Sequence, residues 1–235
     1  MRWSPFLFKW HRRLGYIVAI QVFLWLLGGT LFALMPFADW VKAEASVRKP
    51  VLHVTAPPAA LPALPDGMQQ IQAVQTATGA AWKVKAPHSV QMLDWHTGQP
   101  LPAAPDESAI RRFAQSLYLG SSAIEQSTRL DTLPVRLGMV QEIRAKPPVW
   151  QVRFDDALKT RMYFDARTGE FIGARNNAWV LYDFFWRLHV MDYSEGEDFN
   201  NPLLRVASVL GLLLCISGMG MLGLSMARMW RRKHH

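Results

Sequence analysis

The sequence has 235 residues, half of them hydrophobic, and a formal net charge of +8 with one cysteine. This length allows one or two modest domains, and one cysteine excludes an intrachain disulfide. Eight basic residues near the two ends account for the whole excess charge, because residues 38–205 hold 18 basic and 18 acidic side chains. The neutral centre argues against nucleic acid as a partner.

The first element is an apolar run from Leu14 to Phe37 that contains no charged residue. Its 24 residues exceed the roughly 20 that a helix needs to cross a bilayer. The run is also longer than the apolar part of a signal peptide, which usually has about 7–15 residues. Although residues 43–45 (Ala-Glu-Ala) are similar to a cleavage site, we expect a retained transmembrane helix.

One face of this helix carries features of a ligand site. His11 can ligate a metal, and nearby glycines can admit a flat ring or another helix. A plainer role for His11 is that of an interfacial residue among basic neighbours. Gln21 is the clearest polar group in the run, and it is expected to bond to a partner helix or a cofactor edge, or only to pack. At 100° per residue the predicted line comprises His11, Gly15, Val18, Val22, Trp25 and Gly29.

Residues 50–66 are rich in proline and alanine, which indicates an extended linker. A repeat follows this linker. Residues 80–101 and 148–172 both contain Trp-x-Val-basic and later Asp-x-x-Thr-Gly-[Gln/Glu]. The turn motif predicts Gly98 and Gly169 at positions of positive φ between paired strands.

Each copy of the repeat is preceded by a helix-like stretch, at residues 66–79 and 105–120. Asp106 is the expected N-cap of the second helix. The alternating pattern of residues 149–154 predicts a strand with one buried face. We therefore expect two small α+β units, each with a helix lying on an antiparallel sheet.

A helix predicted over residues 177–193 has two different faces. Asp183 and Arg187 form an i,i+4 pair on one face. His189 lies on the other face, where a neutral imidazole can bind a metal, and Arg187 or Arg205 is near enough in sequence to meet an acidic group of a cofactor. The alternative is an amphipathic interfacial helix whose histidine makes ordinary hydrogen bonds. The residues predicted to share the face of His189 are Tyr182, Phe185, Trp186 and Tyr193.

A second uncharged apolar run extends from Val206 to Ala227 and predicts a second span. Basic residues lie outside both runs, at the two ends of the chain, so the positive-inside rule places both termini in the cytoplasm and the centre outside. A stripe of small residues on this run is suited to close helix packing, either within the chain or between two copies. The stripe comprises Ala207, Gly211, Cys215 and Gly223.

Several of these segments resemble one family. "VWQVRF" and "MYFDARTGEFIG", with the helix before them, resemble a PepSY domain. "KWHRRLGY" before the first span and "WRLHVMDY…DFNNPLL" before the second resemble PepSY-associated transmembrane proteins, which include iron-regulated inner-membrane proteins and ferric-siderophore reductases. The resemblance implies haem b held by membrane histidines. Such reductases typically have four spans, whereas this sequence predicts two.

The resulting prediction is a membrane α+β protein of the bacterial inner membrane, with two transmembrane helices flanking a periplasmic PepSY-like helix-on-antiparallel-sheet domain. The predicted parts are a cytoplasmic basic tail (1–13), transmembrane helix 1 (14–37), a Pro/Ala-rich linker (38–66), a periplasmic PepSY-like domain with two repeats (67–175), an amphipathic helix and loop (176–202), transmembrane helix 2 (203–227) and a second cytoplasmic basic tail (228–235).

His11 and His189 are the predicted metal ligands, with Arg187 and Arg205 as further cofactor-binding residues. The bilayer separates the two histidines by about 30 Å, so they cannot share one iron within a chain. A homodimer with a two-fold axis, or a partner membrane subunit, supplies the missing ligands. The resemblance implies haem-mediated electron transfer as part of a ferric-chelate reductase, with a ferric chelate as acceptor. The alternative is a non-catalytic, membrane-anchored periplasmic module for sensing, inhibition or assembly.

Overall fold

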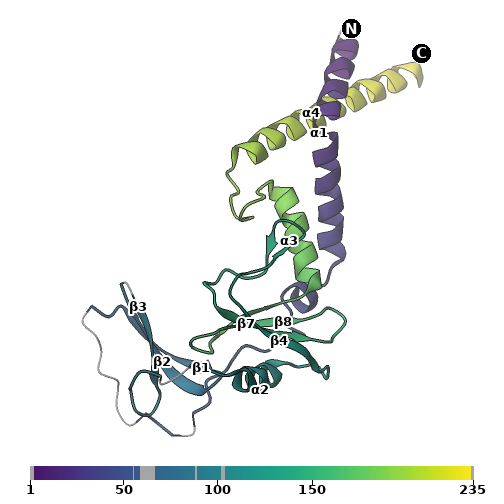
Figure 1. Cartoon of the computed structure of the whole chain (residues 1–235). Coiled ribbons are helices and arrows are strands. Elements are labelled where there is room, and N and C mark those ends of the chain that lie inside the picture. The colour runs from purple at the N-terminus through teal and green to yellow at the C-terminus, as the bar shows by residue number, and fades with distance from the viewer. Residues whose placement is uncertain (1–2, 55, 59–66, 88, 102–103, 234–235) are drawn as a thin grey trace. The chain divides into compact units, whose positions relative to one another are not determined.

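The computed structural model describes residues 3–54, 56–58, 67–87, 89–101 and 104–233. The chain divides into two units, one made of Met1–Leu34 with Tyr182–His235 and the other of Met35–Leu181. The first unit is helical, whereas the second contains all the described strands (Figure 1). The predicted α+β class is therefore confirmed.

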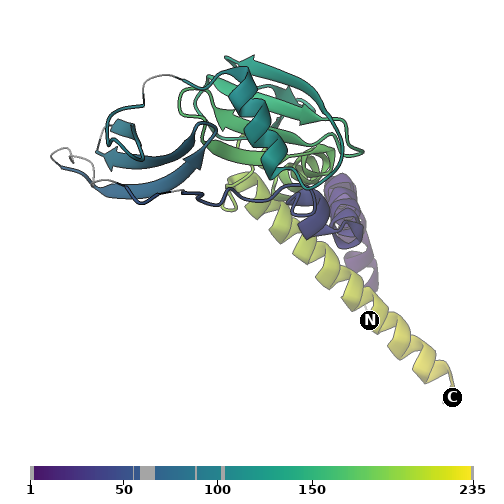
Figure 2. The ribbon, with the colours of Figure 1, turned by 90° about the horizontal axis from the view of Figure 1, so that it is seen from below.

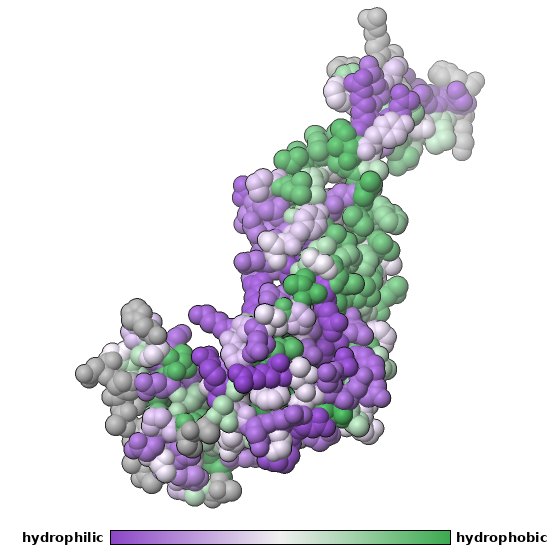
Figure 3. All heavy atoms as spheres, viewed as in Figure 1, coloured by the Kyte–Doolittle hydropathy of each residue, from purple (hydrophilic) through white to green (hydrophobic). Residues whose placement is uncertain are grey.

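Two long apolar helices dominate the first unit. These are α1 (Trp3–Leu34) and α4 (Pro202–Lys233), each of 32 residues. At 1.5 Å per residue each is about 48 Å long, which exceeds the about 30 Å of bilayer hydrocarbon. Pro5–Leu34 and Pro202–Arg232 meet the length and hydropathy expected of membrane spans. Figure 3 shows hydrophobic residues gathered over these helices.

Helix α1 has two neighbours along its length. Its N-terminal half packs on α4, where a Cβ added at Gly15 would lie 3.9 Å from Leu214. Its C-terminal half packs on α3 (Asn177–Val190), where the rings of Phe32 and Tyr182 are 4.6 Å apart. Because the neighbour changes, the facing side of α1 also changes, and Gly28 rather than the predicted Gly29 approaches α3 through Phe185.

The predicted small-residue stripe on α4 is only partly correct. Ala207 and Gly211 are buried, but Cys215 is exposed and a Cβ at Gly223 would meet nothing within 4 Å. The 3.6-residue period of the helix explains the error, since the buried face continues through Ser217.

In its described residues the second unit contains a π-helical turn, three antiparallel sheets, helix α2 (Glu107–Leu117) and the first turn of α3. The turn η1 (Phe37–Val41) follows Pro36. Helix α2 lies across one face of the four-stranded sheet (Figure 2). The sheets are ordered β1(Gln70–Thr76)-β2(Gly79–Ala86)-β3(Ser89–Asp94), β4(Ile124–Leu130)-β7(Val149–Phe154)-β8(Arg161–Asp165)-β9(Phe171–Arg175) and β5(Val135–Arg136)-β6(Val140–Gln141).

Helix α2 begins where the sequence predicted. The Asp106 carboxylate accepts the Ala109 backbone N–H at 2.8 Å, which confirms the N-cap. The apolar face of α2 then buries Ile110 and Leu117 in a cluster with Phe154 from the sheet. A helix on an antiparallel sheet is thus confirmed for the second repeat.

The helix predicted over residues 66–79 is wrong. Residues 70–76 form strand β1, which pairs with β2 from Gln70↔Lys85 to Thr76↔Gly79. The segment contains β-branched residues at 71, 74 and 76, which favour an extended backbone. The Thr76 side chain also donates to the Gly79 carbonyl at 2.9 Å, which closes the hairpin. The first repeat is therefore a three-stranded sheet.

Strand β7 is buried on both faces rather than one. Val152 and Phe154 join the cluster under α2, whereas Val149 packs on the other side with Tyr163. That second side contains a buried ion pair in which Arg161 Nε donates to Glu142 at 2.8 Å. The alternating pattern of β7 alone did not predict this second cluster, because its partners Leu130, Leu133, Ile143 and Ala145 come from outside the strand, in the segment before it.

The two turn glycines occupy the predicted conformation, with φ of 67° at Gly98 and 70° at Gly169. Gly169 is also crowded, since an added Cβ would lie 3.0 Å from the Cβ of Ala77 and 3.1 Å from Pro105. Only glycine meets both demands at position 169.

Candidate functional site

His11 lies where α1 meets α4. Its Nδ1 is 2.9 Å from the Ser217 hydroxyl oxygen, and that hydroxyl donates to the Leu214 carbonyl at 2.8 Å. Because a serine hydroxyl has one proton, it accepts the second bond from His11 Nδ1–H. For a neutral imidazole this arrangement favours the tautomer with its proton on Nδ1 and a lone pair on Nε2, the form that a metal-ligating histidine requires.

The close approach at His11 depends on a missing side chain. A Cβ added at Gly218 would lie 3.2 Å from His11 Cε1. Few real Cβ contacts are that short, so a larger residue at position 218 would displace the imidazole. Ser217 thus hydrogen-bonds the His11 ring, and Gly218, the next residue of α4, leaves room for it. The sequence analysis predicted neither contact.

His189 lies near the end of α3 between two indole rings. Its ring centroid is 5.9 Å from that of Trp25 and 6.3 Å from that of Trp186, which is nearly parallel to it at 11°. Among the described residues, its buried Nδ1 has no hydrogen-bond partner. Burial lowers the pKa of His189 below its ordinary value, which favours the neutral imidazole.

His11 and His189 lie at different heights along the axis of α1. The Trp25 indole donates to the His189 carbonyl at 2.8 Å, and Trp25 is 14 residues beyond His11 on the same helix. At 1.5 Å per residue this is about 21 Å along the axis of α1, which is shorter than the predicted separation of about 30 Å because α3 packs beside α1 instead of beyond its end. One iron cannot bridge that separation, so the two histidines can act only in separate sites.

The two arginines have different surroundings. Arg187 Nε donates to Asp183 at 2.6 Å, which confirms the predicted i,i+4 pair, and Nη1 donates to the Ser194 carbonyl at 2.7 Å. The Arg187 side chain is only 4% exposed. Arg205 is exposed at the start of α4. Arg205 is therefore the better placed of the two to meet an anionic group.

One family model, described as PepSY-associated TM region, matches residues 8–235. The chain belongs to this family. It is accordingly a membrane protein with two apolar helices, one at each end, and a PepSY-like domain between them. Neither a curated protein nor a solved structure matches the chain.

In this PepSY-associated protein, three side chains cap the last carbonyls of α3. Gln21 donates to Leu188 at 3.0 Å, Trp25 to His189 at 2.8 Å, and Asn201 to Val190 at 2.9 Å. A helix end leaves its final carbonyls without internal partners. The polar groups of α1 thus satisfy the backbone of α3, which resolves the open role of Gln21.

The segment after α3 is organised by one carboxylate. Asp192 accepts five hydrogen bonds, from the backbone and hydroxyl of Ser194 and from the backbone of Glu195, Glu197 and Asp198. Bonds from Ser194 and these amides lower the pKa of Asp192 well below its ordinary range. The predicted helix therefore ends at Val190 rather than 193, and Tyr193 lies outside it.

The other described histidines, and two acids of the second repeat, have ordinary surroundings. His53 and His96 are exposed, and His88, His234 and His235 lie outside the described residues. Asp155 pairs with Lys159 and Glu170 with Lys83. Within the described ranges no group of three or more His, Cys, Asp or Glu side chains could hold a metal ion.

Proposed function

We propose that this PepSY-associated protein binds haem b and assists electron transfer across the bacterial inner membrane. The observation that supports this function best is the relay from His11 to Ser217 to the Leu214 carbonyl, which presents Nε2 as a ligand. When a histidine ligates a metal through one ring nitrogen, its other ring nitrogen usually donates a hydrogen bond. The surrounding helices are apolar, which suits a buried redox group.

The fit to haem differs between the two histidines. His11 has an orienting partner and space provided by Gly218, so it fits an axial ligand. Burial favours the neutral form of His189, which is near two indoles, but its Nδ1 has no orienting partner among the described residues. We assign His11 to an inner site, His189 to an outer site, and Arg205 to a propionate. When bound, haem would supply one-electron redox chemistry, and the chain would supply ligands and insulation.

Each site would take its second ligand from another chain. Among the described residues one chain offers one histidine at each level, whereas bis-histidine ligation needs two. A two-fold homodimer would place His11 opposite His11 and His189 opposite His189, and would rebuild a four-span arrangement. A partner membrane subunit with its own histidines would serve equally. Cross-linking in native membranes separates these two arrangements by the mass of the product.

The proposed orientation places both termini in the cytoplasm and the PepSY-like domain in the periplasm. The purely basic ends and the neutral centre support this orientation through the positive-inside rule. The acceptor outside would be a ferric chelate, which rests on the family resemblance. Reporter fusions at Arg48 and after the C-terminus should report opposite sides of the membrane. A cytoplasmic signal from the Arg48 fusion would overturn the orientation.

The direct test is a visible spectrum of the detergent-purified chain, oxidised and reduced. We expect a Soret band that His11→Ala weakens through the inner site and His189→Ala weakens through the outer site. His53→Ala is the matched control, because His53 is exposed in the other unit. A full Soret band in both the His11 and His189 variants would exclude these ligands.

A second candidate is a non-catalytic anchor for the PepSY-like domain, and one observation favours it. The residues around His189 all have structural roles, since Trp25 caps α3, Arg187 holds the following segment and Trp186 donates to the Gly196 carbonyl at 3.1 Å. Under this candidate the segment only attaches the domain, for sensing, inhibition or assembly. Protein purified from haem-replete cells without any Soret band would favour it.

A further inference from the structure

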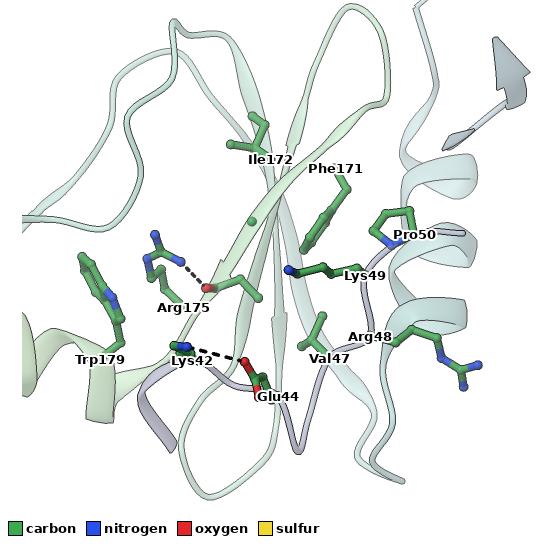
Figure 4. Close-up of a pocket in the computed structure, with 12 residues that line it drawn as sticks. Lys42, Glu44, Val47, Arg48, Lys49, Pro50, Phe171, Ile172, Arg175 and Trp179 are labelled. Carbon is green, nitrogen blue, oxygen red and sulfur yellow. Dashed lines mark hydrogen bonds and ion pairs between the residues drawn. The ribbon is translucent and has the colours of Figure 1, made fainter. Parts of the chain in front are cut away.

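A cavity of about 960 Å³ in the second unit lies beside strand β9. Strand β9 is at the edge of the sheet β4-β7-β8-β9, so one side of its backbone is unpaired by any described strand. Residues 46–50 run along the other side of the cavity (Figure 4). The cavity therefore separates two extended stretches of chain.

We call this cavity the slot. The wall of the slot opposite β9 is held in place by two backbone hydrogen bonds. The Arg48 backbone donates to Leu117 at 2.9 Å, and the Leu119 backbone donates to Ser46 at 2.8 Å. These bonds join residues 46–48 to the end of α2 on the side away from β9. The segment can thus act as a fixed wall, as β9 does through its pairing with β8.

The base of the slot is apolar. Val47, Phe171 and Ala174 pack against the buried cluster under α2 and remain only partly buried themselves. Figure 4 shows Phe171 and Lys49 pointing toward each other across the slot. Alternate side chains of an inserted strand would therefore meet an apolar surface, because successive residues of a strand point to opposite faces.

The rim of the slot is mainly cationic. Lys42, Lys49 and Arg175 line it against one acid, Glu44, while Arg48 points away (Figure 4). Lys42 and Glu44 are 4.0 Å apart and more than half exposed, so this pair neutralises little. Side chains of an inserted strand that face the rim would be favoured if they were acidic.

Arg175 also covers the free edge. Its Nη1 donates to the Ala174 carbonyl at 2.8 Å, and its guanidinium lies 4.5 Å from the Trp179 ring centre. A charged side chain over an edge strand prevents unwanted pairing with other chains. An acidic partner would offer the guanidinium a stronger acceptor than a carbonyl and would free that carbonyl for a strand hydrogen bond.

We propose that this slot binds an extended segment of a partner protein in which apolar and acidic side chains alternate. The segment would add to β9 as a further strand of about five residues, matching the length of β9. Main-chain hydrogen bonds to β9 would supply affinity, Phe171 and Val47 would receive the apolar side chains, and the cationic rim would select for acids. This binding is independent of haem.

The test uses the full chain in a neutral detergent and a labelled, end-blocked octapeptide of alternating Glu and Val, followed by fluorescence anisotropy. We expect saturable binding, no binding of an octapeptide of alternating Lys and Val, and a Kd raised about tenfold or more by Lys42→Glu with Lys49→Glu. Lys146→Glu, an exposed lysine outside the slot, is the matched control and should leave the Kd unchanged.

Two further experiments distinguish addition of the peptide as a strand on β9 from binding by charge attraction alone. Backbone N-methylation of the four valines, or of the four glutamates, should abolish binding in at least one version, because it blocks one edge of the peptide strand. The proposal would be overturned if both methylated peptides bound as tightly as the unmodified peptide. So would an absence of binding at 1 mM, or displacement of the peptide by phosphatidylglycerol vesicles but not by phosphatidylcholine vesicles, which would assign the slot to a lipid surface.

Discussion

Trp25 and His189 are joined twice, by a 2.8 Å hydrogen bond from the indole N–H to the main-chain carbonyl and by ring contact at 5.9 Å. The hydrogen bond involves the backbone of His189 and leaves its imidazole unused. The contact therefore fixes the end of α3 whether or not the imidazole binds a metal. The structural role of the His189 backbone is thus separate from a ligand role of its imidazole, and a substitution of His189 alone would not distinguish the two roles.

Trp25→Phe keeps most of the ring contact and removes the donor. We expect it to lower stability by about 1–2 kcal/mol, since a carbonyl is left without its partner. Trp10→Phe is the control, because Trp10 is 45% exposed near the N-terminus. The measurement is thermal unfolding of the detergent-solubilised chain. Equal melting of the two variants would contradict the capping role.

Ser217→Ala removes the group that orients His11. If His11 ligates haem, we expect haem affinity to fall about 10- to 100-fold, as usual for an outer-shell partner of a ligand. Ser208→Ala is the control, since Ser208 is exposed on the same helix. Titration of haem into the haem-free protein, followed by the Soret band, gives the affinities. Indistinguishable affinities would mean that the relay does not serve ligation.

Asp192→Asn removes the charge that receives five hydrogen bonds, and we expect a loss of about 1–3 kcal/mol at neutral pH. The pKa of Asp192 is lowered in the folded chain, so its stabilisation is fully present above the unfolded pKa of about 3.9 and is lost as the pH falls through the folded pKa. The gap between wild type and variant should therefore be constant from pH 5 to 7 and shrink below about pH 4. Melting curves across this range measure it, and a gap that widens in acid would refute the assignment.

Gly169→Val should destabilise the second unit by about 1–3 kcal/mol, from backbone strain and contact with Ala77 and Pro105. Gly138→Val is the matched control, because Gly138 also has positive φ but open space around its Cα. We expect Gly138→Val to lower the stability of the second unit less than Gly169→Val does. Thermal unfolding followed by circular dichroism distinguishes them, and a greater loss at position 138 would show that the crowding is unimportant.

Local rules predicted the features that depend on neighbours in sequence. The Asp106 cap, the Asp183–Arg187 pair and the turn conformation at Gly169 each follow from chemistry within a few residues. The apolar runs were equally clear, since composition alone marks a helix long enough for a bilayer. These are the interactions that a single sequence encodes most directly.

Features that depend on distant partners were harder to predict. The line of residues on α1 missed Gly28 because the helix changes neighbour from α4 to α3 along its length. The relay of His11 depends on Ser217, 206 positions away. The slot beside β9 joins residues 42–50 to residues 171–179, and no spacing rule connects those segments. Strand β1 was missed for a local reason, since its glutamines and alanine are also compatible with a helix.

The capped end of α3 bears on how deep this helix can lie in a bilayer. A helix terminus is normally confined to water or headgroups because its free carbonyls are costly in hydrocarbon. The last carbonyls of α3 instead receive donors from Gln21, Trp25 and Asn201. The bond to Leu188 also gives the side-chain N–H of Gln21, a polar group within a span, a hydrogen-bond partner. The end of α3 can therefore lie against α1 at the headgroup layer without unpaired carbonyls, while the exposed carboxylates of Glu195, Glu197 and Asp198 that follow it keep their water.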